Sequence, residues 1–203
     1  MIAIIDYGVG NLFSLQASLE KIGAAAVLTS DKSAIRAADK IILPGVGAFE
    51  DASRRLFESG LAELIISETS SGKPILGICL GMQLLFDRSL EFGVHRGLGL
   101  IKGTVRPLSS ILPAGLKIPQ MGWNALSLNR PDCPIFKYSS DGEYVYFVHS
   151  FYGDCADESL AAVCEYGVPV TASVWNGSVY GCQFHPEKSG EVGLKILRAY
   201  SEL

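Results

Sequence analysis

The first half of the chain alternates short apolar runs with segments of helical pattern, and this alternation restricts the folds available to it. Continuous apolar runs suit strands that are buried on both faces. Such strands, when helices separate them, form a parallel sheet covered on both sides, so the sequence predicts an α/β fold. The expected strands are Ile2–Ile5, Ala26–Thr29, Lys40–Leu43 and Ile75–Ile78, and the expected helices are Leu12–Lys21, Lys32–Ala38, Phe49–Gly60 with a continuation to Thr69, and Met82–Phe86.

The second half carries strand patterns with turn signals between them, such as Asn176-Gly177. We interpret them as an antiparallel extension of a mostly parallel central sheet flanked by helices, closed by a final helix near Glu191–Tyr200. No long linker or repeat interrupts the sequence, so residues 1–203 are expected to form a single domain. The expected strands are Ile101–Leu108, Trp123–Leu128, Tyr144–Val148, Ala161–Glu165, Thr171–Trp175 and Val179–Phe184.

Composition and charge exclude several classes of function. The formal net charge is −4 and no basic tract is present, so neither nucleic acid nor a membrane surface is an expected partner. No apolar run reaches the length of a membrane span and the start lacks the basic region of a signal peptide, so we expect a cytoplasmic protein. The five cysteines and three histidines are scattered, which argues against a disulfide framework and against a metal site.

The segment Gly77–Gly81, G-I-C-L-G, has the pattern of a nucleophile elbow with cysteine as the nucleophile. A buried strand precedes Cys79 and a helix follows it, and the two glycines permit the sharp turn between them. This turn places Cys79 at the helix N-terminus, where the positive end of the helix dipole favours a thiolate. On its own, such a pattern is also typical of a structural turn.

A base and a carboxylate for this nucleophile occur late in the chain, in the sequence His185-Pro186-Glu187. If strand geometry continues through this segment, the side chains of His185 and Glu187 project on the same face. Cysteine chemistry on acyl groups requires a base near the thiol and a group that orients the base. We therefore expect a catalytic triad of Cys79, His185 and Glu187.

Acyl transfer also requires donors for an oxyanion, and the sequence offers two. The backbone N–H of Leu80 lies at the start of the expected helix. The glycine-rich turn Pro44–Gly47 follows the third strand, and its backbone amides can point toward the site, although a plain strand-to-helix turn has the same pattern. Gln83 lies one helical turn after Cys79, where its amide can hold a substrate or simply occupy the helix.

Neither nucleotide-binding fingerprint is present, and no cofactor is expected. The run Tyr7–Asn11 resembles the start of G-x-G-x-x-G, but Phe13 stands where the third glycine belongs. No G-x-x-x-x-G-K-[ST] phosphate loop occurs either.

Taken together, these motifs resemble those of the class I glutamine amidotransferases, whose triad they match. Further segments are similar to the glutaminase subunits of imidazole glycerol phosphate synthases, which serve histidine biosynthesis. The resemblance covers essentially the whole chain. Its segments are Gly77–Gln83, Phe184–Glu187, Asp6–Leu12, Leu43–Phe49, Pro119–Asn124 and Tyr146–Ser150.

The resemblance implies a role for each matching residue. Cys79 would form a glutamyl thioester, His185 would move the proton, and Glu187 would orient His185. The amides of Val46 and Leu80 would form the oxyanion hole. Glutamine would be bound by Gly47, Gln83, Ser150 and Phe151, and the face toward a partner would include Asn11, Trp123 and Lys188.

The partner implied by the resemblance is a (β/α)8-barrel cyclase subunit, which forms a heterodimer with the glutaminase. Ammonia from glutamine would react there with a nucleotide to give imidazole glycerol phosphate and an aminoimidazole carboxamide ribotide. Three alternatives remain open from the sequence. They are a paralogous glutaminase serving a sugar-amidating synthase of surface polysaccharides, a cysteine hydrolase or peptidase on the same elbow, and a pseudo-glutaminase retained for its interaction surface.

Overall fold

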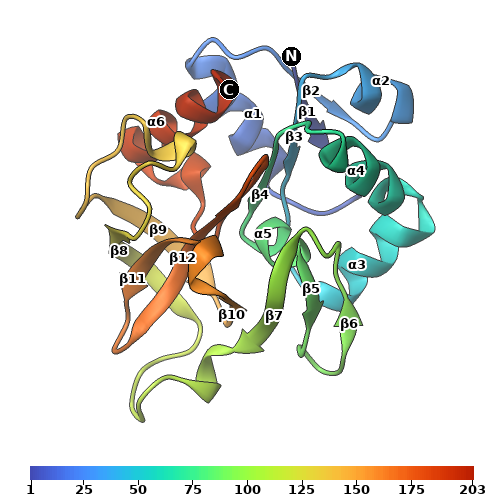
Figure 1. Ribbon diagram of the computed structural model, residues 1–203. Coiled ribbons are helices and arrows are strands. Elements are labelled where there is room, and N and C mark those ends of the chain that lie inside the picture. Colours follow the sequence, from blue (N-terminus) through green and yellow to red (C-terminus); the bar gives the residue numbers. More distant parts are fainter.

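A nine-stranded mixed sheet forms the centre of the computed structural model, which describes all 203 residues (Figure 1). Its strands are β1 (Ile2–Ile5), β2 (Ala26–Thr29), β3 (Lys40–Leu43), β4 (Ile75–Ile78), β8 (Gln120–Leu128), β9 (Tyr144–His149), β11 (Leu160–Glu165), β12 (Pro169–Asn176) and β13 (Val179–Cys182). Their order is β2-β1-β3-β4-β13-β12-β11-β8-β9. The first five strands in this order pair in parallel and the other four join by antiparallel pairing, which confirms the predicted α/β class.

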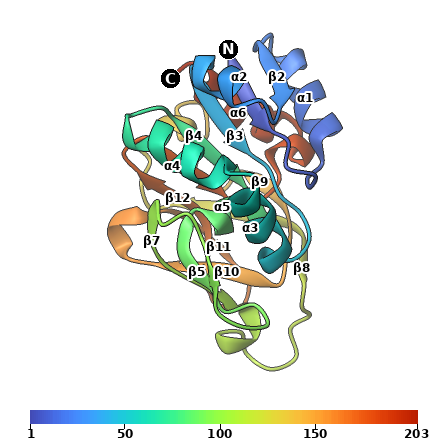
Figure 2. The ribbon, with the colours of Figure 1, turned by 90° about the vertical axis from the view of Figure 1, so that its right-hand side faces the viewer.

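Helices cover both faces of the parallel part of the sheet (Figures 1 and 2). The helices α1 (Leu12–Lys21) and α6 (Gly190–Ser201) pack on one face, and α2 (Lys32–Ala37), α3 (Phe49–Glu58) and α4 (Leu61–Ser70) pack on the other. Successive strand residues point to opposite faces, so each strand supplies both layers. Ile2 and Ile4 join the core under α1 and α6, whereas Ala3 and Ile5 join the core under α2, α3 and α4.

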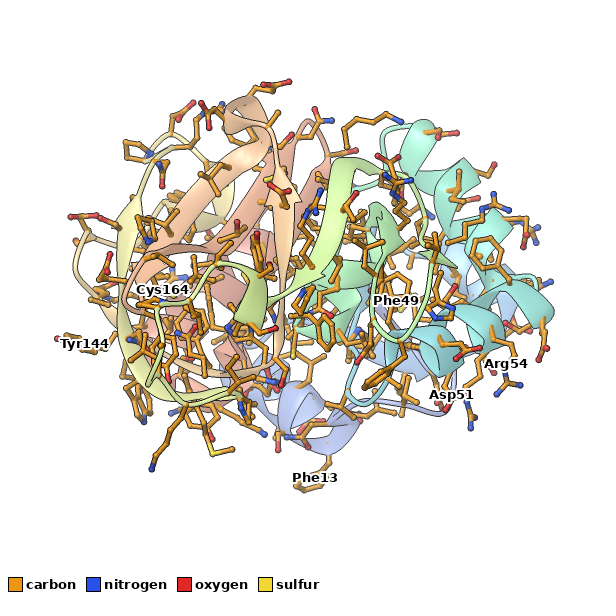
Figure 3. The ribbon with its side chains drawn as sticks, turned by 90° about the horizontal axis from the view of Figure 1, so that it is seen from below. Phe13, Phe49, Asp51, Arg54, Tyr144 and Cys164 are labelled. Atoms are coloured by element: carbon orange, nitrogen blue, oxygen red, sulfur yellow. The ribbon has the colours of Figure 1, made fainter.

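The helix α3 illustrates why its sequence folds against the sheet. Phe49 is fully buried, whereas Asp51 and Arg54 lie on the outer side of the helix and form an ion pair of 2.7 Å (Figure 3). The apolar side chains recur at helical spacing and form one buried stripe. None of the helices combines the length and the apolar character that crossing a membrane requires.

A second sheet of four strands lies below α3 in Figure 1, and the sequence did not predict it. It contains β5 (Phe86–Ser89), β6 (His95–Arg96), β7 (Ile101–Pro107) and β10 (Phe151–Cys155), in the order β10-β7-β5-β6. The expected placement of Ile101–Leu108 in the extension of the central sheet is therefore wrong. This strand pairs with β5 and β10 instead, and pairing between distant segments leaves no local signal.

Two predicted helices also differ from the observed ones. The expected helix from Phe49 to Thr69 is two helices, because Gly60 between α3 and α4 adopts a left-handed φ of 69°. The expected helix Met82–Phe86 is α5 (Leu80–Leu84). It begins directly after Cys79 and ends early because Phe86 enters β5.

Candidate active site

A cavity of about 480 Å³ opens at the carboxyl ends of the parallel strands, where ligands bind in open α/β sheets. The second sheet contributes one wall of it. The lining residues are Val46, Gly47, Cys79, Leu80, Gln83, Glu91, Phe92, Pro119, Val148, His149, Ser150, Phe151 and His185. A larger cavity of about 730 Å³ lies near both chain ends, but its lining contains no cysteine or histidine. The smaller cavity is therefore the candidate site.

Cys79 stands in a sharp turn between β4 and α5, with φ 55° and ψ −112°. Such a conformation is strained for a residue with a side chain, and residues held this way are frequent at functional sites. Its backbone is fixed on both sides, since its N–H donates to Cys182 O at 2.7 Å and its carbonyl accepts from Gln83 N at 3.2 Å. The sharp turn expected from the sequence is thus present at Cys79.

The two glycines of the elbow permit close approach of backbone segments. A Cβ atom on Gly77 would lie 2.6 Å from the Gly81 carbonyl oxygen. A Cβ atom on Gly81 would lie 1.8 Å from the carbonyl oxygen of Leu43, at the end of β3. The glycines therefore allow α5 to start directly against the sheet.

His185 and Glu187 form a buried pair in which Nδ1 lies 2.8 Å from Oε1, and each side chain is 3% exposed. The sequence pattern predicts that a continued strand places both side chains on one face. This prediction is wrong, because β13 ends at Cys182. A 3-10 turn over Pro186–Lys188 returns the Glu187 carboxylate to the ring instead. With Nδ1 donating to the carboxylate, Nε2 is the atom left for the substrate, and it has no hydrogen-bond partner within the chain.

The charge of His185 is set by opposing effects. Burial alone would lower its pKa, but interactions with the Cys79 sulfur and the Glu187 carboxylate outweigh burial and raise the pKa from 6.5 to about 9. At neutral pH the ring is therefore an imidazolium, which can protonate a leaving group at the cavity.

We expect the imidazole of His185 to titrate near pH 9 in the folded chain, as measured by NMR of histidine labelled at Cε1. Because the pKa is higher in the folded state than the ordinary 6.5, the pair stabilises the fold fully below pH 6.5 and stops doing so as pH rises through about 9. Replacing Glu187 by glutamine should lower the pKa. The control is Glu191→Gln, because Glu191 is exposed, and this change should leave the pKa of His185 unaltered. A pKa of His185 near 6.5 in the unaltered chain would contradict the account.

The expected oxyanion donors come from two segments that meet at the cavity. Leu80 is the first residue of α5, and the first amides of a helix have no partners within it. Val46 and Gly47 line the same cavity from the turn after β3. Val46 is 41% exposed, and Gly47 has a φ of 93° with open space beside it.

The expected substrate residues Gly47, Gln83, Ser150 and Phe151 all line the cavity. The side-chain amide of Gln83 already donates to Phe151 O at 3.1 Å and to Gln183 Oε1 at 3.0 Å. Its NH2 group is therefore engaged within the protein, and it positions the backbone of Phe151. No cluster of three or more histidine, cysteine or acidic side chains is suited to hold a metal ion.

The sequence reasoning missed two polar residues of the cavity. Glu91 lies in the loop between β5 and β6, and its Oε2 accepts from Phe49 N at 2.6 Å. His149 is buried, its Nδ1 lies 2.7 Å from Phe151 O, and its Nε2 has no partner. Burial lowers the pKa of His149 to about 4, so the ring is neutral and Nδ1 carries the proton. Glu91 stands in no recognisable sequence pattern, and His149 lies within the segment Tyr146–Ser150, where the sequence predicted no role for this histidine.

The three expected interface residues lie around the cavity rather than in it. Trp123 is 52% exposed and packs edge-on against Tyr146, with ring centroids 6.0 Å apart. The Lys188 ammonium lies 6.0 Å from the centre of the same ring. Asn11 shares a narrow gap with His185 and Glu187.

The fold and this site define the class of protein. The family model described as "Glutamine amidotransferase class-I" matches residues 3–199. The chain therefore belongs to the class I glutamine amidotransferase family. Solved structures agree on the fold: one titled "Crystal structure of glutamine amidotransferase" has a TM-score of 0.77 at 15% identity over 100% of both chains. "Structure of PurLQS from Thermotoga maritima" has a TM-score of 0.73 at 25% identity, covering 98% of this chain and 96% of that one.

Similar curated proteins specify the group within the class. The "Imidazole glycerol phosphate synthase subunit HisH" of Caldanaerobacter subterraneus subsp. tengcongensis is 50% identical, covering 100% of this chain and 98% of the relative. The protein of the same name from Geobacter sulfurreducens is 49% identical with the same coverage. This chain thus falls within the family of the HisH subunits.

Proposed function

We propose that this chain, as a single domain, hydrolyses glutamine through a thioester on Cys79 and supplies ammonia for histidine biosynthesis. The Cys79 sulfur attacks the carboxamide carbon, and the amides of Leu80 and Val46 stabilise the oxyanion. His185, oriented by Glu187, protonates the departing ammonia and then helps water to hydrolyse the thioester. The strained backbone of Cys79 beside the buried His185–Glu187 pair is the observation that carries this assignment.

The cavity provides complementary groups for a free amino acid. Gly47, Ser150 and Phe151 offer backbone and hydroxyl groups near the nucleophile, and Gln83 holds Phe151 in place. The Glu91 carboxylate is suited to the α-ammonium group of glutamine, because a half-buried carboxylate on the cavity wall can accept a charge-assisted hydrogen bond from a cation. The cavity of about 480 Å³ accommodates a ligand of this size.

The partner that we propose is a (β/α)8-barrel cyclase subunit, bound as a heterodimer over the face that carries Asn11, Trp123 and Lys188. There ammonia would yield imidazole glycerol phosphate and aminoimidazole carboxamide ribotide. A contiguous apolar patch on a surface marks an interaction site, and we propose that the exposed apolar side chains near Asn11 and Trp123 form such a patch. Phe13 is 85% exposed and projects from the molecule (Figure 3), and Met121 is 64% exposed.

We place this reaction in the cytoplasm. All five cysteines, Cys79 among them, are free thiols, which suits a reducing compartment.

Replacing Trp123 by alanine should weaken the response to the partner. Because tryptophan side chains often dominate binding at interfaces, we expect about tenfold more cyclase to be needed for half-maximal stimulation. The measurement is glutamate release by the chain alone and in a titration with cyclase and its nucleotide. The control is Tyr138→Ala, because this aromatic residue contacts Glu202 at the chain end and not the proposed docking face. It should leave the titration unchanged.

An unchanged titration for Trp123→Ala would contradict the proposed docking face. If no cyclase stimulates glutamate release while a sugar-amidating synthase does, the partner of this chain belongs to the polysaccharide pathway instead.

A further inference from the structure

The turn Pro44–Gly47 has one constrained end and one free end. A Cβ atom on Gly45 would lie 2.9 Å from the Gly81 amide nitrogen and 3.0 Å from the Leu80 Cβ atom. A Cβ atom on Gly47 would meet nothing within 4 Å. The start of the turn is therefore packed against α5, whereas Gly47 at the other end has open space beside it.

Tyr7 lies at the constrained end. It follows β1, is 7% exposed, and its hydroxyl donates to the carbonyl of Pro44 at 2.7 Å. The same hydroxyl lies 2.9 Å from the position of a Cβ atom on Gly45, as the Gly81 amide nitrogen does, so it lies beside the contact between this glycine and α5. Burial, together with the nearby Cys79 sulfur, raises the pKa of Tyr7. The hydroxyl therefore remains protonated and able to donate.

An oxyanion hole requires donors that are already aimed at the developing charge. Here the two donors come from separate segments, the amide of Leu80 on α5 and the amides around Val46 in the turn. A contact that holds the start of the turn against α5 sets the distance between them. The Tyr7 hydroxyl, bonded to Pro44 O, is such a contact.

We propose that Tyr7 is a positioning residue for glutamine hydrolysis, whose hydroxyl fixes the Pro44–Gly45 end of the turn. This inference rests on the proposed function. Tyr7 does not touch the substrate; it acts through the donor that the turn carries.

The test replaces Tyr7 by phenylalanine, which removes only the hydroxyl, in the complex with cyclase and nucleotide. Removing an oxyanion donor outright costs about 10²–10³ in kcat, so loosening one should lower kcat about tenfold. The KM for glutamine should change less than about twofold, because ground-state contacts are kept. The matched control is Tyr200→Phe, since this buried hydroxyl also donates to backbone carbonyls, those of Ile41 and Pro74 at the other end of the strands.

Two further readouts separate positioning from a general loss of structure. The γ-aldehyde analogue of glutamine forms a tetrahedral adduct on Cys79 whose oxygen occupies the oxyanion hole, so it should bind about tenfold more weakly to Tyr7→Phe. Alkylation of Cys79 by iodoacetamide generates no oxyanion and should keep its rate.

The inference is overturned if Tyr7→Phe matches Tyr200→Phe in kcat. It is equally overturned if alkylation falls as far as analogue binding, because that result indicates a structural role. If Cys79→Ala hydrolyses glutamine as fast as the unaltered chain, the proposed function fails and the inference fails with it.

Discussion

Replacing Cys79 by alanine is expected to reduce glutamate release in the cyclase complex by about 10⁴-fold or more, as removal of the nucleophile does in other triad enzymes. Cys79 is the one cysteine among the residues that line the cavity, so no second thiol is present to replace it. The other polar groups of the turn are backbone amides, and Gln83 is engaged with Phe151 and Gln183. The fold should persist, because cysteine and alanine both carry a Cβ atom. The strained φ of 55° at position 79 is therefore no less favourable for alanine than for cysteine.

The control is Cys164→Ala. Cys164, which is labelled in Figure 3, is also buried, but it lies on β11, separated from β4 by β13 and β12, and it does not line the cavity. Its replacement should leave glutamate release unchanged. If the Cys79 variant retained a tenth of the activity, another residue would have to be the nucleophile.

Gly81→Ala is expected to give the second largest effect. A methyl group here would lie 1.8 Å from the Leu43 carbonyl oxygen, so α5 must move away from β3. Displacement of the nucleophile and of the Leu80 amide by about 1 Å should cost about 10²-fold in glutamate release. Overpacking of this kind should also destabilise the fold by about 1–3 kcal/mol, measured from the urea midpoint.

Gly177→Ala is the control that separates the loss of activity expected for Gly81→Ala from its loss of stability. Gly177 has a φ of 57° but open space around it, and it lies in the turn between β12 and β13. Its replacement should cost about 1 kcal/mol of stability through backbone strain alone, with no loss of glutamate release. Full activity in Gly81→Ala would mean that the close contact of α5 with β3 is dispensable.

The parallel half of the fold could be predicted from sequence because its signals are local. The four strands β1 to β4 are continuous apolar runs bounded by turn residues, and they occur where they were expected. The strands of the second sheet carry weaker signals. β6 has only two residues, and β10 contains Gly153 and Asp154, which are disfavoured in strands.

The candidate site shows the same division between local and spatial information. Cys79 and the His185–Glu187 pair stand in short motifs whose chemistry can be read directly. Glu91 could not be found, because it reaches the cavity through a sheet formed by distant segments. Tyr7 stood in a glycine-rich run and in the segment Asp6–Leu12, but no role could be predicted for it, since its bond to Pro44 O joins residues 37 positions apart.

The central claim is that glutamine hydrolysis passes through a thioester on Cys79, and the most direct test is to trap that intermediate. The cyclase complex is mixed with glutamine, quenched in acid during turnover, digested, and analysed by mass spectrometry. The account predicts the added mass of one glutamyl group on the peptide that contains Cys79, absent from the other four cysteines and from Cys79→Ala. Sustained glutamate release without this adduct, or with the adduct on another cysteine, would contradict the account.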